Sequence, residues 1–228
     1  MRFAFTPTTK LELRNRALPG PIRYFCNIPR LEYPMWRLAC SSLLAGLVAV
    51  PLAATAQQKS VEQQIAEAVS PLPEEMQDVA TVLAYVDGDT LSQVRMGLST
   101  MICLADDPKI DGFHAACYHR DLEPFMARGR KLRAQGKTIA EAQQSRIKEI
   151  DAGELPMPSH PAALYSLTGP EGSFNHNTGS AVGARGLHVI YVPYATETSI
   201  GISEVASSGR PWLMYPGTGM AHIMIQIP

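Results

Sequence analysis

The stretch Met220-Ala221-His222-Ile223-Met224-Ile225-Gln226-Ile227 alternates between two kinds of side chain along its length. Successive side chains of a β-strand point to opposite faces of its sheet. One face of such a strand would be wholly apolar and would carry Ala221, Ile223, Ile225 and Ile227. The stretch therefore predicts a strand whose aliphatic face is buried, and with it a fold that is built on a sheet.

Other segments rich in β-forming residues predict the partners of this strand. Three of them follow one another closely, and the turn sequence Asp87-Gly88-Asp89 separates the first two, so we expect a small antiparallel meander there. The remaining segments lie in the second half of the chain, around a long polar loop from Thr168 to Gly186. The predicted strands before the final one are 79–87, 91–96, 98–104, 163–167, 187–194 and 212–215.

Two other regions have the periodicity of amphipathic helices. Residues 59–69 place apolar side chains on one stripe, with Ser60 as the cap of the helix. Residues 119–151 predict a helical pair interrupted at Gly136, and a capping box at 138–141 starts the second helix. Together these patterns predict a single-domain α+β fold: an antiparallel sheet of about six short strands, with the helical pair packed on one face.

A different pattern precedes the predicted domain. Residues 35–56 contain the basic residue Arg37, then an apolar run and the small-residue sequence Ala54-Thr55-Ala56. This order is typical of a signal peptide cleaved before Gln57, and it predicts a periplasmic or secreted protein. The alternative is an uncleaved membrane anchor, since the apolar segment is nearly long enough to span a bilayer. Residues 1–34 show no regular period, and we interpret them as a non-structural leader or as the product of a start assigned too early.

Of the 228 residues, cleavage after residue 56 would leave 172, enough for one domain with a sizeable core. We expect 57–78 to form an N-terminal helix and linker, and 79–228 to form the globular domain. Seven of the chain's 20 basic residues and two of its 21 acidic residues precede residue 57, so 13 and 19 remain, a net charge of −6. This excludes general nucleic-acid binding, which needs a basic surface. No second apolar run approaches the length of a membrane span, so no membrane contact is expected after cleavage.

Cys103 and Cys117 are the two cysteines that remain after such a cleavage. An even pair in an oxidising compartment is most simply one disulfide, and closing a loop of this length stabilises a protein by about 3 kcal/mol. The alternative is a zinc site, because these cysteines alternate with His114 and His119 in the pattern C-x10-H-x2-C-x-H. A disulfide is the prediction, since this spacing matches no common zinc module.

The other face of the strand predicted at 220–227 carries the candidate site. Met220, His222 and Met224 lie on this face, and thioethers beside an imidazole are ligands that Cu(I) prefers. His188 and Met214, on neighbouring predicted strands, could complete it. The candidate ligand-binding residues are therefore His222, His188, Met220 and Met224. Methionines that fill a core and a histidine with a local hydrogen bond would give the same pattern.

The sequence contains no nucleophile elbow, no H-E-x-x-H zinc motif and no phosphate-binding loop. The cofactor stays unknown from the sequence, and a hydrolase with His222 or His188 as its base would lack a visible nucleophile. We therefore predict an exported soluble domain that binds a small ligand or a protein partner, through the candidate face and the Gly-rich loop 168–186. The alternative is a periplasmic metal- or haem-binding protein or oxidoreductase that uses His222 with Met220 and Met224.

Two motifs also resemble those of a group of exported bacterial proteins of unknown function. The first is Cys103-Leu104-Ala105-Asp106-Asp107-Pro108 with the later Cys117, and the second is Pro211-Trp212-Leu213-Met214 followed by Gly217-Thr218 and Ala221-His222-Ile223-Met224. The likeness covers most of residues 79–228. It implies a single domain with a shared ending around His222, and it implies no activity, cofactor or catalytic residue.

Overall fold

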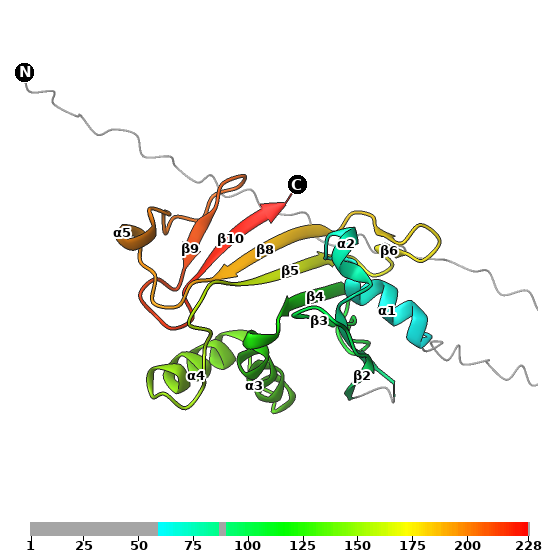
Figure 1. Ribbon diagram of the computed structural model, residues 1–228, viewed down its shortest axis with the longest axis horizontal. Helices are drawn as coiled ribbons and strands as arrows, with labels where there is room; N and C mark the ends of the chain where they lie inside the picture. Colours follow the sequence, from blue (N-terminus) through cyan, green and yellow to red (C-terminus); the bar gives the residue numbers. More distant parts are fainter. Residues whose placement is uncertain (1–58, 87–89, 228) are drawn as a thin grey trace, which may run out of the picture. The chain divides into compact units, whose positions relative to one another are not determined.

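A computed structural model describes residues 59–86 and 90–227, which belong to one compact unit of the chain. The leader predicted at 1–34 and the signal peptide predicted at 35–56 lie outside the described residues. Figure 1 shows a sheet with helices packed against it. In chain order the elements are α1 (Val61–Val69), α2 (Glu74–Gln77), β1 (Thr81–Tyr85), β2 (Leu91–Arg95), β3 (Met101–Leu104), β4 (Phe113–His119), the 3-10 turn η1 (Arg120–Leu122), α3 (Glu123–Ala134), α4 (Ile139–Asp151), β5 (Ala162–Gly169), β6 (Phe174–Asn175), β7 (Ser180–Ala181), β8 (Arg185–Tyr191), α5 (Glu197–Ile200), β9 (Trp212–Met214) and β10 (His222–Ile227).

Eight strands form one sheet in the order β2-β1-β3-β4-β5-β8-β10-β9, and β6 pairs with β7 separately inside the predicted polar loop. β1 and β3 are parallel neighbours, whereas the other pairs of the sheet are antiparallel. The α+β class of the domain is confirmed. The prediction of about six strands, all antiparallel, is wrong, because the sheet is larger and mixed.

β1 and β3 are parallel because the segment that joins β2 to β3 passes across the start of β1. The Gly97 N–H donates to Thr81 Oγ1 over 3.1 Å, and the Ser99 N–H donates to the carbonyl of Val79 over 2.9 Å. This crossing places β3 on the side of β1 that β2 leaves open. An alternating pattern identifies a strand without specifying its neighbour, so the expected meander is incorrect at this step.

β4 is a strand that the sequence pattern does not predict. Its residues are buried at five of seven positions, and these positions fall on both of its faces. A strand that is buried on both faces lacks the apolar and polar alternation by which half-buried strands are recognised. The strand occupies the centre of the sheet, between β3 and β5.

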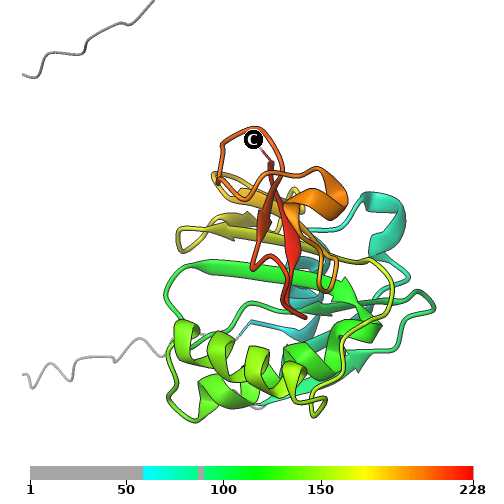
Figure 2. The ribbon, with the colours of Figure 1, turned by 90° about the vertical axis from the view of Figure 1, so that its left-hand side faces the viewer.

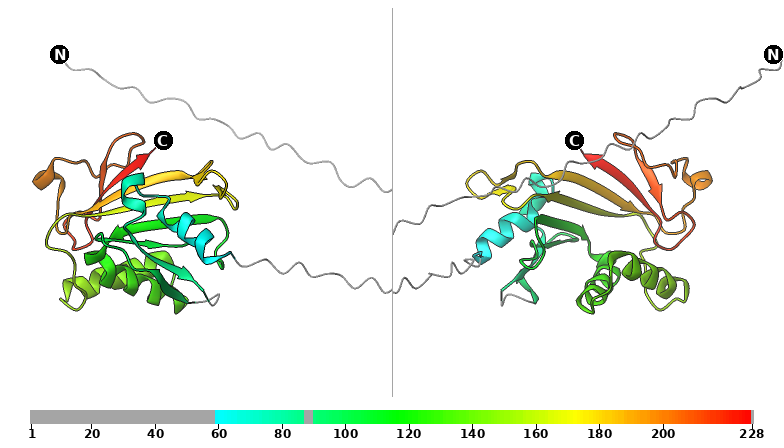
Figure 3. Two further views of the ribbon diagram at one scale, coloured as in Figure 1. Left: turned by 45° about the vertical axis from the view of Figure 1, so that its right-hand side comes forward. Right: turned by 180° about the vertical axis from the view of Figure 1, so that it is seen from behind.

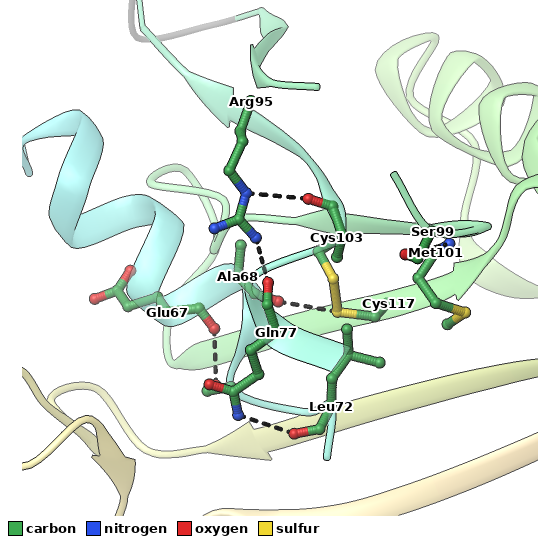
Figure 4. Close-up of a disulfide and its surroundings, with 11 residues drawn as sticks. Glu67, Ala68, Leu72, Gln77, Arg95, Ser99, Met101, Cys103 and Cys117 are labelled. Carbon is green, nitrogen blue, oxygen red and sulfur yellow. Dashed lines mark hydrogen bonds between the residues drawn. A yellow bond between two sulfur atoms is a disulfide. The ribbon is translucent and has the colours of Figure 1, made fainter. Parts of the chain in front are cut away.

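The predicted disulfide is confirmed between β3 and β4. Cys103 and Cys117 are direct partners in the register of these strands, and their sulfur atoms are bonded. Both side chains are fully buried, and Cys117 Sγ lies 3.1 Å from the carbonyl oxygen of Ala68 in α1 (Figure 4). The bond leaves neither sulfur as a thiolate, so the alternative zinc site with His114 and His119 is wrong.

Helices cover both faces of the sheet. On one face, α1 packs through Ala68 against β1, β3 and Cys117. On the other face, Phe125 of α3 and Ile150 of α4 pack against Tyr118 and the neighbouring strands. The two faces are opposite because Cys117 and Tyr118 are consecutive residues of β4. Figure 2 shows α3 and α4 side by side, and Figure 3 shows this pair well apart from α1.

The predicted helix starts at Ser60 and Thr138 are confirmed. Each hydroxyl accepts from the backbone N–H three residues later, and the side chain at that third position reaches back to the cap. Among residues 59–86 and 90–227, no helix is long and apolar enough to cross a membrane.

Candidate functional site

His222, the centre of the predicted site, is a buried residue at the start of β10. Only 6% of it is exposed, and its Nδ1 lies 2.7 Å from the carbonyl oxygen of Met220, to which the ring N–H donates. The rings of Tyr191 and Tyr215 lie 5.0 Å and 5.7 Å from the imidazole, centre to centre. The imidazole is therefore enclosed by aromatic rings, with one nitrogen engaged by the backbone.

The surroundings of His222 favour its neutral form over its protonated form. Burial lowers the pKa of His222 below its ordinary value, and the positive charge of Arg146 acts in the same direction, while the hydrogen bond to Met220 opposes them. Met220 and Met224 belong to the same apolar cluster as Phe125 and Tyr191. These contacts are those of a polar residue that is satisfied within a core.

The structure brings together only three of the four predicted ligand-binding residues. His222 is opposite Tyr191 in the register of β10 and β8, and Met224 is opposite Val189. His188 is opposite Ile225, so it lies on the other face of the sheet. There its ring contacts that of Tyr165, with centres 4.8 Å apart. His188 therefore does not face His222.

The buried imidazole predicts a pH effect on stability. The pKa of His222 is lowered in the folded protein, whereas in the unfolded chain it has its ordinary value of about 6.5. Below this pH the unfolded chain therefore binds more protons than the folded protein does. The free energy of unfolding should therefore fall as the pH drops below this value. In His222→Asn, which keeps a donor for the Met220 carbonyl, urea unfolding between pH 8 and pH 5 should show a shallower decline than the wild type. Equal slopes would contradict the buried, neutral imidazole.

Two adjoining hollows lie at the end of the sheet where α4 and α5 are found in Figure 1. Their volumes are about 460 Å³ and about 330 Å³, and both are open to solvent. They share Ser159, Pro193 and Tyr194 as a common wall. The larger hollow is otherwise lined by Ile150, Gly153, Leu155, Pro156, Met157 and Pro158, and the smaller by His160, Pro161, Val192, Ala195, Ser199 and Ile200.

Tyr194 holds an unusual backbone conformation within this wall. Its φ is 64°, in the left-handed region that side chains other than glycine rarely adopt, and 57% of the residue is exposed. The loop is held in place by the Tyr194 N–H, which donates to the carbonyl of Thr218 over 2.8 Å. A Cβ atom at Gly219 would lie 3.2 Å from the Tyr194 hydroxyl and 2.2 Å from Ile150 Cγ2. Gly219 therefore makes room for both lining residues.

A cluster of polar side chains borders the smaller hollow at His160. Asp121 Oδ2 lies 3.3 Å from His160 Nε2 and 3.7 Å from His119 Nδ1. The two imidazole rings meet edge to face, with centres 5.6 Å apart. His119 ends β4, Asp121 lies in η1, and His160 precedes β5. One possible ligand atom from each residue lies within 4.8 Å of the others, so this cluster is the place where the described residues could hold a metal ion.

Sequence reasoning misses this cluster because it treats its members separately. The sequence pattern suggests His119 as a possible zinc ligand beside the cysteines, and neither Asp121 nor His160 belongs to that pattern. The signal that connects them is the pairing of β4 with β5, which brings the end of one strand beside the start of the other. Without β4, nothing in the sequence places residue 160 near residue 119.

Comparison with models of protein families, with curated proteins and with solved structures found no match for this chain.

Proposed function

We propose that this protein is an exported binding domain that holds a small apolar or ring-bearing ligand in the two hollows against Tyr194. The observation that carries the proposal is the conformation of Tyr194. Left-handed backbone at a residue other than glycine costs roughly 1 to 3 kcal/mol and is concentrated at functional sites. In this protein the left-handed backbone of Tyr194 places an exposed aromatic ring in the wall shared by both hollows.

The chemistry of the lining supports a ligand of this kind. Ligand sites are commonly concave, mostly apolar and roughly 300 to 1,000 Å³ in volume, with a few polar groups that orient the ligand. The larger hollow has an aliphatic and proline wall with Ser159 at its edge. Proline residues have a fixed φ, so the wall from Pro156 to Pro161 loses little conformational entropy when a ligand binds. A planar ring on the ligand would stack on Tyr194.

Export of the domain is supported by two features. The sequence at 35–56 has the order of parts of a signal peptide, which would direct the chain out of the cytoplasm. A buried disulfide between Cys103 and Cys117 fits an oxidising compartment, where such bonds persist. The alternative centred on His222, with Met220 and Met224 as metal ligands, has less support, because its imidazole is buried and hydrogen-bonded to the backbone.

Replacing Tyr194 with glycine tests the proposal. Indole and p-cresol serve as ring-bearing probes, and binding is followed by ¹H–¹⁵N chemical-shift changes. We expect shifts confined to residues 153–160 and 192–200 in the wild type, and at least about tenfold weaker binding in Tyr194→Gly, since the stacking surface is gone. Glycine adopts the φ of 64° without strain, so the free energy of unfolding of the variant should lie within about 1 kcal/mol of that of the wild type.

The matched control is Tyr215→Phe. Tyr215 is the second tyrosine with a positive φ, but it lines neither hollow, and its hydroxyl donates to Gln143 Oε1 over 2.7 Å. This variant should bind the probes as the wild type does. Unchanged binding in Tyr194→Gly, or the absence of localised shifts in the wild type, would refute the proposed site.

A further inference from the structure

We infer that His119, Asp121 and His160 together bind a divalent transition-metal ion, zinc in the first place. The inference stands independently of the ligand proposed for the hollows. Two imidazoles and one carboxylate converge at this place from three different segments of the chain. This is a set of three protein ligands of the kind that open zinc sites use, in which water or a substrate completes the coordination.

The distances suit one small ion. Zinc is bound by imidazole nitrogen and carboxylate oxygen at about 2.0 to 2.2 Å, which places two ligand atoms of a tetrahedral site about 3.4 Å apart. Asp121 Oδ2 lies 3.3 Å from His160 Nε2 and 3.7 Å from His119 Nδ1. The ligand atoms of His119 and His160 also lie within 4.8 Å of each other, so rotations of the side chains would bring the three atoms towards the separations that zinc needs.

The positions of the ligands are set by the fold. His119 Nδ1 accepts from the backbone N–H of Asp121 at 3.3 Å, so the lone pair of this nitrogen points towards η1 and the carboxylate that follows. That hydrogen bond is long, and a cation is a stronger partner for the same lone pair. β4 and β5 are antiparallel neighbours, which keeps the approach to β5, and with it His160, beside the end of β4.

The charges also favour a cation. Within the described part of the chain, the carboxylate of Asp121 contacts the imidazoles of His119 and His160 and forms no ion pair with lysine or arginine. Two imidazole donors select zinc, nickel, cobalt or copper over calcium and magnesium, which prefer oxygen. The side chains of His119, Asp121 and His160 are 23%, 44% and 52% exposed, so ions can enter and water can take the remaining position.

Titration of the full chain with zinc chloride tests the inference. Cys26 and Cys40 are replaced by serine in every sample, because a thiolate would bind zinc on its own. Isothermal titration calorimetry should show one zinc ion per chain. His160→Ala and Asp121→Asn should each weaken binding at least about tenfold, since even the loss of a group that only supports a metal ligand weakens binding about 10- to 100-fold. Both residues are exposed, so these variants should fold. The reference protein carries only the two serine substitutions and is called the parent. His188 lies on another part of the sheet, so His188→Ala should bind zinc as the parent does.

A second readout separates a metal site from a merely structural cluster. Zinc should raise the melting temperature of the parent protein in a concentration-dependent manner, and it should fail to do so in His160→Ala. Cobalt(II) in place of zinc should give a d–d absorption spectrum without the charge-transfer band of a thiolate ligand. The inference is overturned if no zinc binds at millimolar concentration, or if His160→Ala and Asp121→Asn bind it as tightly as the parent.

Discussion

Replacing both Cys103 and Cys117 with alanine is expected to lower the free energy of unfolding by about 3 kcal/mol. The bond closes a loop between residues 14 positions apart, and without it the unfolded chain gains conformational freedom. The two sulfur atoms are also fully buried between β1, β3 and α1, so their loss leaves a cavity in that cluster. For a domain of this size, the melting temperature should drop by about 10 °C.

Thermal unfolding followed by circular dichroism measures this change, and thiol labelling provides the control. Because both sulfurs are inaccessible in the folded state, a mild reductant should leave the bond intact until the protein unfolds. The double variant should keep the far-ultraviolet spectrum of the wild type. A melting temperature equal to that of the wild type would show that the bond does not stabilise the fold.

A loss at least as large is expected from Gly97→Ala, at the crossing between β2 and β3. A Cβ atom there would lie 2.3 Å from the carbonyl carbon of Ala80 and 2.4 Å from the backbone nitrogen of Thr81. Those atoms are backbone, so no side chain can rotate to relieve the overlap. Separating β1 from the crossing segment should cost about 3 kcal/mol or more, measured by urea unfolding.

Gly136→Ala is the matched control for this prediction. Gly136 has a φ of +83°, and a Cβ atom there would meet nothing within 4 Å. The cost at this position is backbone strain alone, about 1 kcal/mol. If Gly97→Ala is no more destabilising than Gly136→Ala, then the chain does not cross β1 as described, and the parallel pairing of β1 with β3 is in doubt.

Local signals in the sequence predict the local features of the fold. The cap at Ser60 and the capping box at Thr138 form as their residue types indicate, and β10 forms within the alternating stretch, from His222 to Ile227. The disulfide follows from a simple count of cysteines. Features that depend on neighbours in space are not predicted. β4 is buried on both faces and so shows no period, and the partner of β3 is decided by a crossing that no periodicity records.

The candidate site shows the same division. Alternation separates the two faces of β10, but the prediction that the aliphatic face is the buried one is only partly right. Ile227 is 37% exposed, whereas His222 on the other face is 6% exposed. The Met220 and Met224 face packs under α3 and α4, whereas Ala221 and Ile223 pack in a smaller cluster with Leu213. The face interpreted as a binding surface is therefore covered by helices. Tyr194 and the cluster at His160 are formed by loops, whose positions depend on the completed sheet.

A crystallographic screen with small ring-bearing fragments tests the central claim, that the protein binds its ligand against Tyr194, most directly. We expect fragments to collect in the hollow between Pro156–Ser159 and Pro193–Tyr194, with a ring stacked on the tyrosine. The same soaks of Tyr194→Gly crystals should leave this place without a fragment. Fragments that bind repeatedly elsewhere on the domain, and never at Tyr194, would contradict the account.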